Sequence, residues 1–124
     1  MGTIDEYLKG ILGQILTSYK ILTELDDNPD DLEIIKKELS KIRGLLHILY
    51  TKLDNKKYQS DRLVTLHKLS ASYIDTYDFT REIEILAQIY YKDSSRLKNL
   101  RLLIINSLND KRLIEKFQTI LNEL

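Results

Sequence analysis

Residues that interrupt helices are rare in this chain, and their scarcity constrains the fold more than any other feature of the sequence. The 124 residues include one proline, Pro29, and only four glycines. Proline and glycine are the residues that most strongly oppose a helix interior. We therefore expect an all-α fold, since 43% of the residues are hydrophobic and few of the remainder would stop a helix.

Two long stretches repeat apolar positions at alternating steps of three and four, which places one apolar stripe on each helix. The first stripe comprises Ile4, Leu8, Ile11, Ile15, Ser18, Leu22 and Leu25, and the second comprises Leu32, Ile35, Leu39, Ile42, Leu46, Leu49 and Leu53. The pattern predicts helices over about residues 3–25 and 29–53. Because only a short acidic turn separates them, they should form an antiparallel hairpin.

The rest of the chain predicts shorter helices after a polar loop at residues 54–60. Whether the chain breaks around residues 75–78 is left open by the sequence. The predicted helix caps are Thr3, Asn28, Ser60 or Asp61, Asp93 or Ser94, and Asn109. The expected fold is a compact bundle of five or six helices that opens with the long hairpin, and residues 1–124 should form a single domain.

Several functional classes are disfavoured by what the sequence lacks. There is no cysteine, so disulfides and thiolate metal sites are excluded. No stretch is apolar enough for a membrane span, and the acidic residues Asp5 and Glu6 do not fit a secretory signal. Glu-x-x-His, HExxH, glycine-rich phosphate-loop and GxSxG motifs are also missing. We expect a cytoplasmic protein without a metal site or a cofactor.

Charges are sorted along the chain although the net charge is zero. Residues 1–35 contain eight acidic and two basic residues, whereas residues 36–68 contain nine basic and three acidic residues. We expect Asp26, Asp27, Asp30 and Asp31 to lie at the opposite end of the hairpin from Lys52, Lys56 and Lys57. Such a dipolar molecule can bind a polyanion and can associate with its own copies, although two solvated helix faces would look the same.

Candidates for catalysis are few. His47 lies among apolar residues of the second helix and is expected to be a partly buried packing residue. Arg62 and His67 have the Arg-x4-His spacing that resembles the motif of HEPN-domain ribonucleases. In that family the arginine and histidine of two protomers would converge on an RNA phosphate, where the arginine stabilises charge and the histidine transfers a proton.

A different family resemblance covers roughly residues 38–124. The segment Ser40-Lys41-Ile42-Arg43-Gly44-Leu45-Leu46-His47-Ile48-Leu49-Tyr50 is similar to a segment of the small subunit of Csm-type (type III-A) CRISPR effector complexes. Leu66 to Tyr73, with Arg81, is a loose counterpart of the following helix in that family. The resemblance implies a protein that is not an enzyme, whose copies stack along the guide–target RNA duplex and touch its phosphates.

The expected RNA-binding residues follow from the resemblance and from the excess of basic residues at positions 36–68, here called the basic third. The motif carries over to Lys41 and Arg43, and the basic third adds Lys52, Lys56, Lys57, Arg62 and Lys68. The expected partners are RNA, other subunits of a ribonucleoprotein complex and further copies of the chain, but no membrane. Two alternatives stay open: a HEPN-like ribonuclease using Arg62 and His67, and a viral or plasmid helical interaction module without nucleic acid.

Overall fold

The computed structural model describes residues 3–124, in which helices account for all regular structure. The elements are α1 (Thr3–Thr23), α2 (Asp31–Leu53), α3 (Asp61–Thr76), α4 (Thr80–Gln88), α5 (Ser94–Asn109), the short 3-10 turn η1 (Asp110–Arg112) and α6 (Leu113–Glu123). No strand occurs in this part of the chain. The predicted all-α bundle of five or six helices is confirmed.

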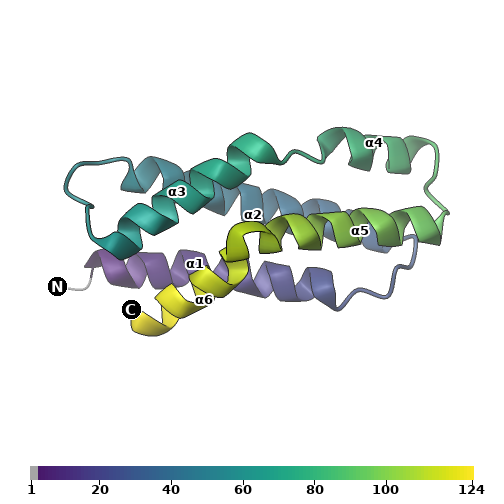
Figure 1. Cartoon of the computed structure of the whole chain (residues 1–124). Coiled ribbons are helices and arrows are strands. Elements are labelled where there is room, and N and C mark those ends of the chain that lie inside the picture. The colour runs from purple at the N-terminus through teal and green to yellow at the C-terminus, as the bar shows by residue number, and fades with distance from the viewer. Residues whose placement is uncertain (1–2) are drawn as a thin grey trace.

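The opening hairpin is formed by α1 and α2, which run antiparallel (Figure 1). Both predicted apolar stripes face inward: every member of the α2 stripe is buried, and α1 buries Leu8, Ile11, Ile15 and Leu22. Even Ser18 is buried, because its hydroxyl donates to the Glu38 carboxylate across the helix pair at 2.8 Å. The alternating spacing therefore predicted which face of each helix enters the core.

The remaining helices cover the hairpin. In Figure 1, α3 runs along α2, while α5 and α6 follow each other along α1. Their buried residues join one continuous core that includes Leu66, Ile104 and Phe117. In contrast, α4 buries only Leu86 and projects beyond the end of α3.

The chain does break between α3 and α4. Tyr77 is extended, and the Asp78 carboxylate accepts the backbone N–H of Thr80 at 2.9 Å, which starts the next helix. Two predicted caps are confirmed: Ser60 accepts from Leu63 N at 3.4 Å and Asp93 accepts from Arg96 N at 3.1 Å. The suggested cap on Thr3 concerns a side chain that lies outside the described residues.

Two other predicted caps are wrong. The second helix begins at Asp31 rather than Pro29, and it is the Asp31 carboxylate that accepts the backbone N–H of Asn28 at 3.1 Å. Asn109 does not cap the last helix, because its side-chain amide donates to the Tyr19 hydroxyl at 2.8 Å. At the second helix a different local contact replaces the expected one, whereas at the last helix the replacing contact joins residues 90 positions apart.

Candidate nucleic-acid interface

The solvent face of α2 gathers most of the basic residues of this helix. An α-helix turns by 100° per residue, so residues opposite the buried stripe share one outer face. That face, here called the α2 basic face, consists of the exposed residues Lys36, Lys37, Ser40, Lys41, Gly44, His47, Ile48, Thr51 and Lys52. From Lys36 to Lys52 it extends roughly 24 Å at 1.5 Å per residue.

Only weak contacts hold these lysines to the protein. Lys36 lies 3.5 Å from the Glu33 carboxylate, and Lys41 lies 3.5 Å from the Glu38 carboxylate. Lys37 forms no ion pair within residues 3–124. The Lys36–Glu33 pair is solvent-exposed and is easily exchanged for another partner. The Lys41 pair differs, because the Glu38 side chain is only 4% exposed, whereas the Lys41 side chain is 47% exposed. The ammonium groups of Lys36 and Lys37 are therefore available to an external anion, and Lys41 lies beside them with about half of its side chain exposed.

Small side chains separate the lysines. The middle of the face carries only short side chains, those of Ser40, Gly44 and Thr51. A Cβ atom placed on Gly44 would have no other atom within 4 Å. Glycine in a helix interior costs stability relative to alanine, roughly 0.5–1 kcal/mol. No internal packing requires Gly44, so the space above it is open to a polymer backbone.

Lys56 and Lys57 extend the positive charge past the end of α2. Both are exposed in the loop that leads to α3, close in sequence to Lys52. The Lys57 ammonium lies over the Tyr58 ring at 5.1 Å, and the Lys52 ammonium lies over the Tyr7 ring at 5.5 Å. Of the predicted RNA-binding residues, the structure brings Lys41, Lys52, Lys56 and Lys57 to one face and its end.

The other three predicted residues lie elsewhere. Arg43 is on the flank of α2 and donates to the backbone carbonyl oxygen of Tyr77. Arg62 is on the far side of α3 and donates to the carbonyl oxygen of Glu123 at 3.1 Å. Lys68 is exposed on α3. Both arginines thus connect separate parts of the bundle, a role that cannot be recognised from residue type or spacing.

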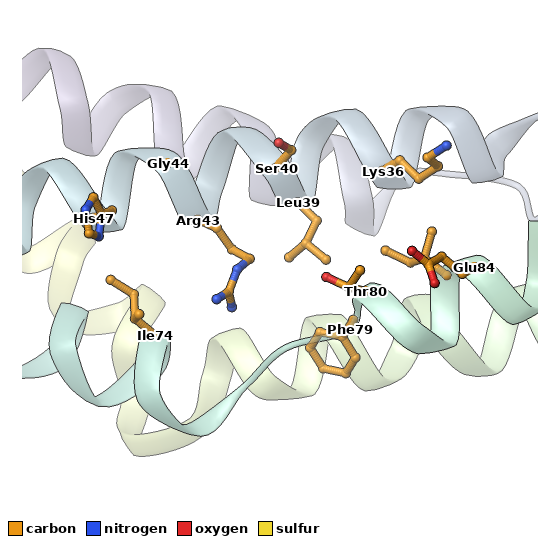
Figure 2. A pocket seen from close by; sticks show the side chains of 11 residues that line it. Lys36, Leu39, Ser40, Arg43, Gly44, His47, Ile74, Phe79, Thr80 and Glu84 are labelled. Carbon is orange, nitrogen blue, oxygen red and sulfur yellow. The ribbon is translucent and has the colours of Figure 1, made fainter.

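Beside the α2 basic face, α2, the end of α3 and the start of α4 line an open groove of about 720 Å³. Figure 2 shows Arg43 directed into it from α2, with Phe79 on the opposite side and Glu84 facing Lys36. His47 also lines it and is exposed, so the prediction of a partly buried packing residue is wrong. Helical periodicity could have placed it, because His47 follows Lys36 by 11 residues, about three turns.

The Arg62–His67 pair does not converge within one chain. His67 stacks on the Tyr50 ring of α2 with a centroid distance of 5.0 Å, and its Nε2 lies 3.8 Å from the Asp54 carboxylate. Arg62 instead contacts the end of α6. Five residues along a helix rotate the second side chain about 140° from the first, which explains the divergence.

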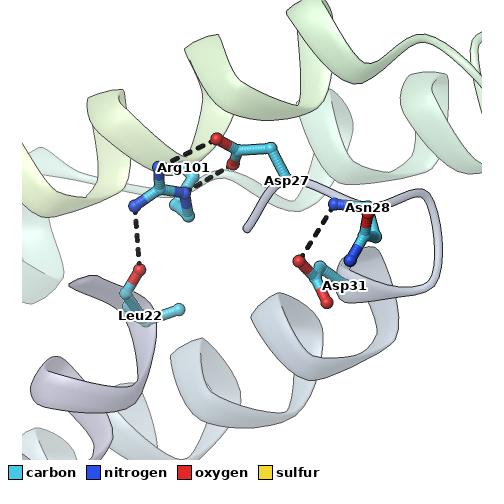
Figure 3. A network of polar contacts seen from close by, with 5 residues as sticks. All are labelled: Leu22, Asp27, Asn28, Asp31 and Arg101. Atoms are coloured by element: carbon cyan, nitrogen blue, oxygen red, sulfur yellow. Dashed lines mark hydrogen bonds and ion pairs between the residues drawn. The ribbon is translucent and has the colours of Figure 1, made fainter. Parts of the chain in front are cut away.

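At the acidic end of the hairpin, two of the four aspartates are used internally. Arg101 of α5 forms a two-pronged pair with Asp27, with Nε–Oδ1 and Nη2–Oδ2 distances of 2.6 and 3.0 Å, and it also donates to Leu22 O at 3.1 Å (Figure 3). These hydrogen bonds hold the pKa of Asp27 below its ordinary value. Asp31 is buried, which leaves Asp26 and Asp30 exposed. The predicted acidic patch is therefore smaller than its composition indicated.

Two further properties bear on the site. Within residues 3–124, no three His, Asp or Glu side chains are grouped so that they could hold a metal ion. None of the described helices combines the length and the apolar character that crossing a bilayer would require.

Comparison with known proteins gave no relative: no protein-family model, no curated protein and no solved structure matches the chain. The similarity of Ser40–Tyr50 to the Csm-type small subunit therefore stays a prediction.

Proposed function

We propose that this protein is a non-catalytic RNA-binding and assembly subunit of a cytoplasmic CRISPR-type ribonucleoprotein, which stacks along the guide–target RNA duplex through phosphate contacts. The observation that carries the RNA part is the α2 basic face, where Lys36, Lys37, Lys41 and Lys52 stand exposed around the open space above Gly44. The resemblance of Ser40–Tyr50 to the Csm-type small subunit supports the second part of the proposal, that the protein belongs to a CRISPR-type complex.

The arrangement suits binding without sequence selection. Lysine is a flexible, strongly hydrated point charge that meets phosphates without fixed geometry. Contacts to phosphates supply affinity and make it fall steeply with salt, but they carry no sequence information. A lysine face with small residues between the charges is therefore expected to follow a nucleic-acid backbone and not to read its bases.

Assembly is supported by the placement of charge at the two ends of the hairpin. The α1–α2 turn with Asp26 and Asp30 and the α2–α3 loop with Lys56 and Lys57 lie at opposite ends of the molecule (Figure 1). Their separation exceeds the Debye length of about 8 Å at physiological salt, so each end acts independently. A head-to-tail contact between copies can then propagate into an open filament, provided that its rotation does not close a ring. Sedimentation velocity should show self-association that strengthens at low salt, and a monomer at every salt concentration would remove this part of the proposal.

RNA binding is tested by titrating labelled single-stranded and duplex RNA at low and physiological salt. We expect affinity to fall by about an order of magnitude or more between the two conditions. The triple variant Lys37→Gln, Lys41→Gln, Lys52→Gln should weaken binding strongly. The matched control is Lys9→Gln, Lys92→Gln, Lys116→Gln, which removes the same charge from exposed positions outside the face.

Two outcomes would contradict the proposal. Absence of binding at low salt with micromolar protein would refute RNA binding by the isolated subunit. Equal losses in the two triple variants would show that net charge, and not the α2 basic face, determines the affinity.

A further inference from the structure

The groove between α2 and α4 differs chemically from the basic face that it adjoins. Its α2 side carries the cationic side chains of Lys36 and Arg43 together with His47, and Glu84 is the one acidic residue that lines it. The side opposite α2 is mostly apolar, with Ile74, Phe79 and Ile83 half-buried and the polar Thr80 among them. A volume of about 720 Å³ lies within the range of small-molecule sites, roughly 300–1,000 Å³.

These two surfaces fit a ligand that has an anionic end and a flat apolar part. Arg43 is already oriented by its hydrogen bond to the Tyr77 carbonyl, and a guanidinium group retains further N–H donors for a phosphate. Phe79 lines the groove, and its ring stacks on the Tyr77 ring at a centroid distance of 6.2 Å. Because Phe79 is only half-buried, the uncovered part of the ring leaves an aromatic surface against which a nucleobase can pack. A nucleotide unit combines both features.

The groove also opens where a bound strand would pass. Lys36, Ser40, Gly44 and His47 belong both to the α2 basic face and to the lining of the groove. A strand whose phosphates lie on the face would therefore have its bases beside the groove. In a fully paired duplex the bases are held in the stack, so only an unpaired nucleotide could enter.

We propose that the α2–α4 groove holds one unpaired nucleotide of the bound RNA, with its phosphate at Arg43 and its base against the apolar side formed by Ile74, Phe79 and Ile83. This inference rests on the proposed RNA-binding function. It adds a preference for unpaired RNA that the basic face alone does not provide.

The test compares a short labelled single strand with the blunt duplex that it forms with its complement, using fluorescence anisotropy at low salt. Phe79→Leu keeps an apolar side chain but removes the ring, so it should weaken single-strand binding by about fivefold or more and leave duplex binding nearly unchanged. Tyr91→Leu is the control, because Tyr91 is an exposed aromatic residue outside the groove. It should change neither affinity.

A second pair of variants does not depend on Phe79. Glu84→Gln removes the acidic charge from the groove and should strengthen single-strand binding by about twofold, whereas Glu82→Gln, on the same helix but outside the groove, should have a smaller effect. Circular dichroism verifies that each variant is folded.

The outcomes separate the groove from the function on which it rests. If neither RNA binds the wild-type protein, the proposed function fails and the inference fails with it. If both RNAs bind but Phe79→Leu and Glu84→Gln affect them equally or not at all, only the groove assignment is overturned. Saturable binding of free adenosine 5′-monophosphate, without a difference between strand and duplex, would indicate a free-nucleotide site and would also overturn the inference.

Discussion

Removing the negative charge of Asp27 from its ion pair with Arg101 should cost a large part of the folding stability, and Asp27→Asn tests this. Arg101 lies on α5 and binds the turn between α1 and α2, so the pair joins segments 74 residues apart. The side chains of Arg101 and Asp27 are only 10% and 16% exposed. Asparagine has the same shape as aspartate and tolerates the left-handed φ of 64° at this position, so the substitution removes the charge alone.

The expected loss follows from burial. Removing one partner of a buried ion pair costs about 3–5 kcal/mol because the other charge is left uncompensated. The asparagine oxygen can still accept one hydrogen bond from Arg101. We therefore expect the free energy of unfolding to fall by about 3 kcal/mol, the lower end of this range. Against a total stability of about 5–15 kcal/mol this is a substantial share. The melting temperature should fall by roughly 10–20 °C.

Urea and thermal unfolding followed by circular dichroism would measure the loss. Glu115→Gln is the matched control, because Arg112 also forms a two-pronged pair with Glu115 but the two side chains are 72% and 61% exposed. Exposed pairs of this kind contribute little, so the control should unfold almost as the wild-type protein does. If the two variants lose similar stability, burial does not determine the strength of the Asp27–Arg101 pair and the reasoning is refuted.

Three further predictions concern stability. Hydrogen bonds from Arg101 lower the pKa of Asp27 below its ordinary value of 3.8. The stability that the Asp27 carboxylate contributes is therefore present above pH 3.8 and is lost as the pH falls through the lower pKa of the folded state. The difference in free energy of unfolding between the wild-type protein and Asp27→Asn, measured in urea, should shrink in acid. Gly44→Ala should raise the free energy of unfolding by about 0.5–1 kcal/mol, because alanine favours a helix interior over glycine and its methyl group meets nothing within 4 Å. A lower free energy of unfolding in urea would contradict this. Tyr73→Phe should cost about 0.5–1.5 kcal/mol in the same assay, because it removes the buried 2.8 Å hydrogen bond to Ser107, and no measurable loss would show that the bond is energetically neutral.

The parts of the fold that depend on local periodicity could be predicted, whereas only some of the helix ends could: the caps at Ser60 and Asp93 were predicted correctly. The alternating steps of three and four identified the buried residues of α1 and α2 because one face of each helix meets the core. The cap predicted at Asn28 was wrong because a competing local contact formed, in which Asp31 accepts the Asn28 N–H three residues away. The cap predicted at Asn109 was wrong because its side chain donates to Tyr19, 90 residues away, and this contact exists only after the chain has folded.

In the candidate site, too, the local pattern could be predicted from the sequence and the contacts between helices could not. The sequence located the basic third, and helical periodicity could have added Lys36, Lys37 and His47 to one face. It could not reveal that Arg43 and Arg62 donate to backbone carbonyls of Tyr77 and Glu123. Composition counts a basic residue in the same way whether it binds a ligand or another helix.

The division of roles between arginine and lysine leads to a quantitative expectation for RNA binding. A planar guanidinium group suits fixed contacts between helices, and the hydrated lysine ammonium suits a changing anionic partner. Of the nine basic residues at positions 36–68, the two arginines are engaged with carbonyl groups and Lys68 lies off the face, which leaves six lysines. Neutralising six phosphates of a single strand predicts a slope of about −4 in a plot of log affinity against log salt, and the phosphate proposed at Arg43 makes it about −5, whereas nine contacts would give about −6. Measuring that slope distinguishes these cases, and a value near −6 would mean that Arg62 and Lys68 contact the RNA as well.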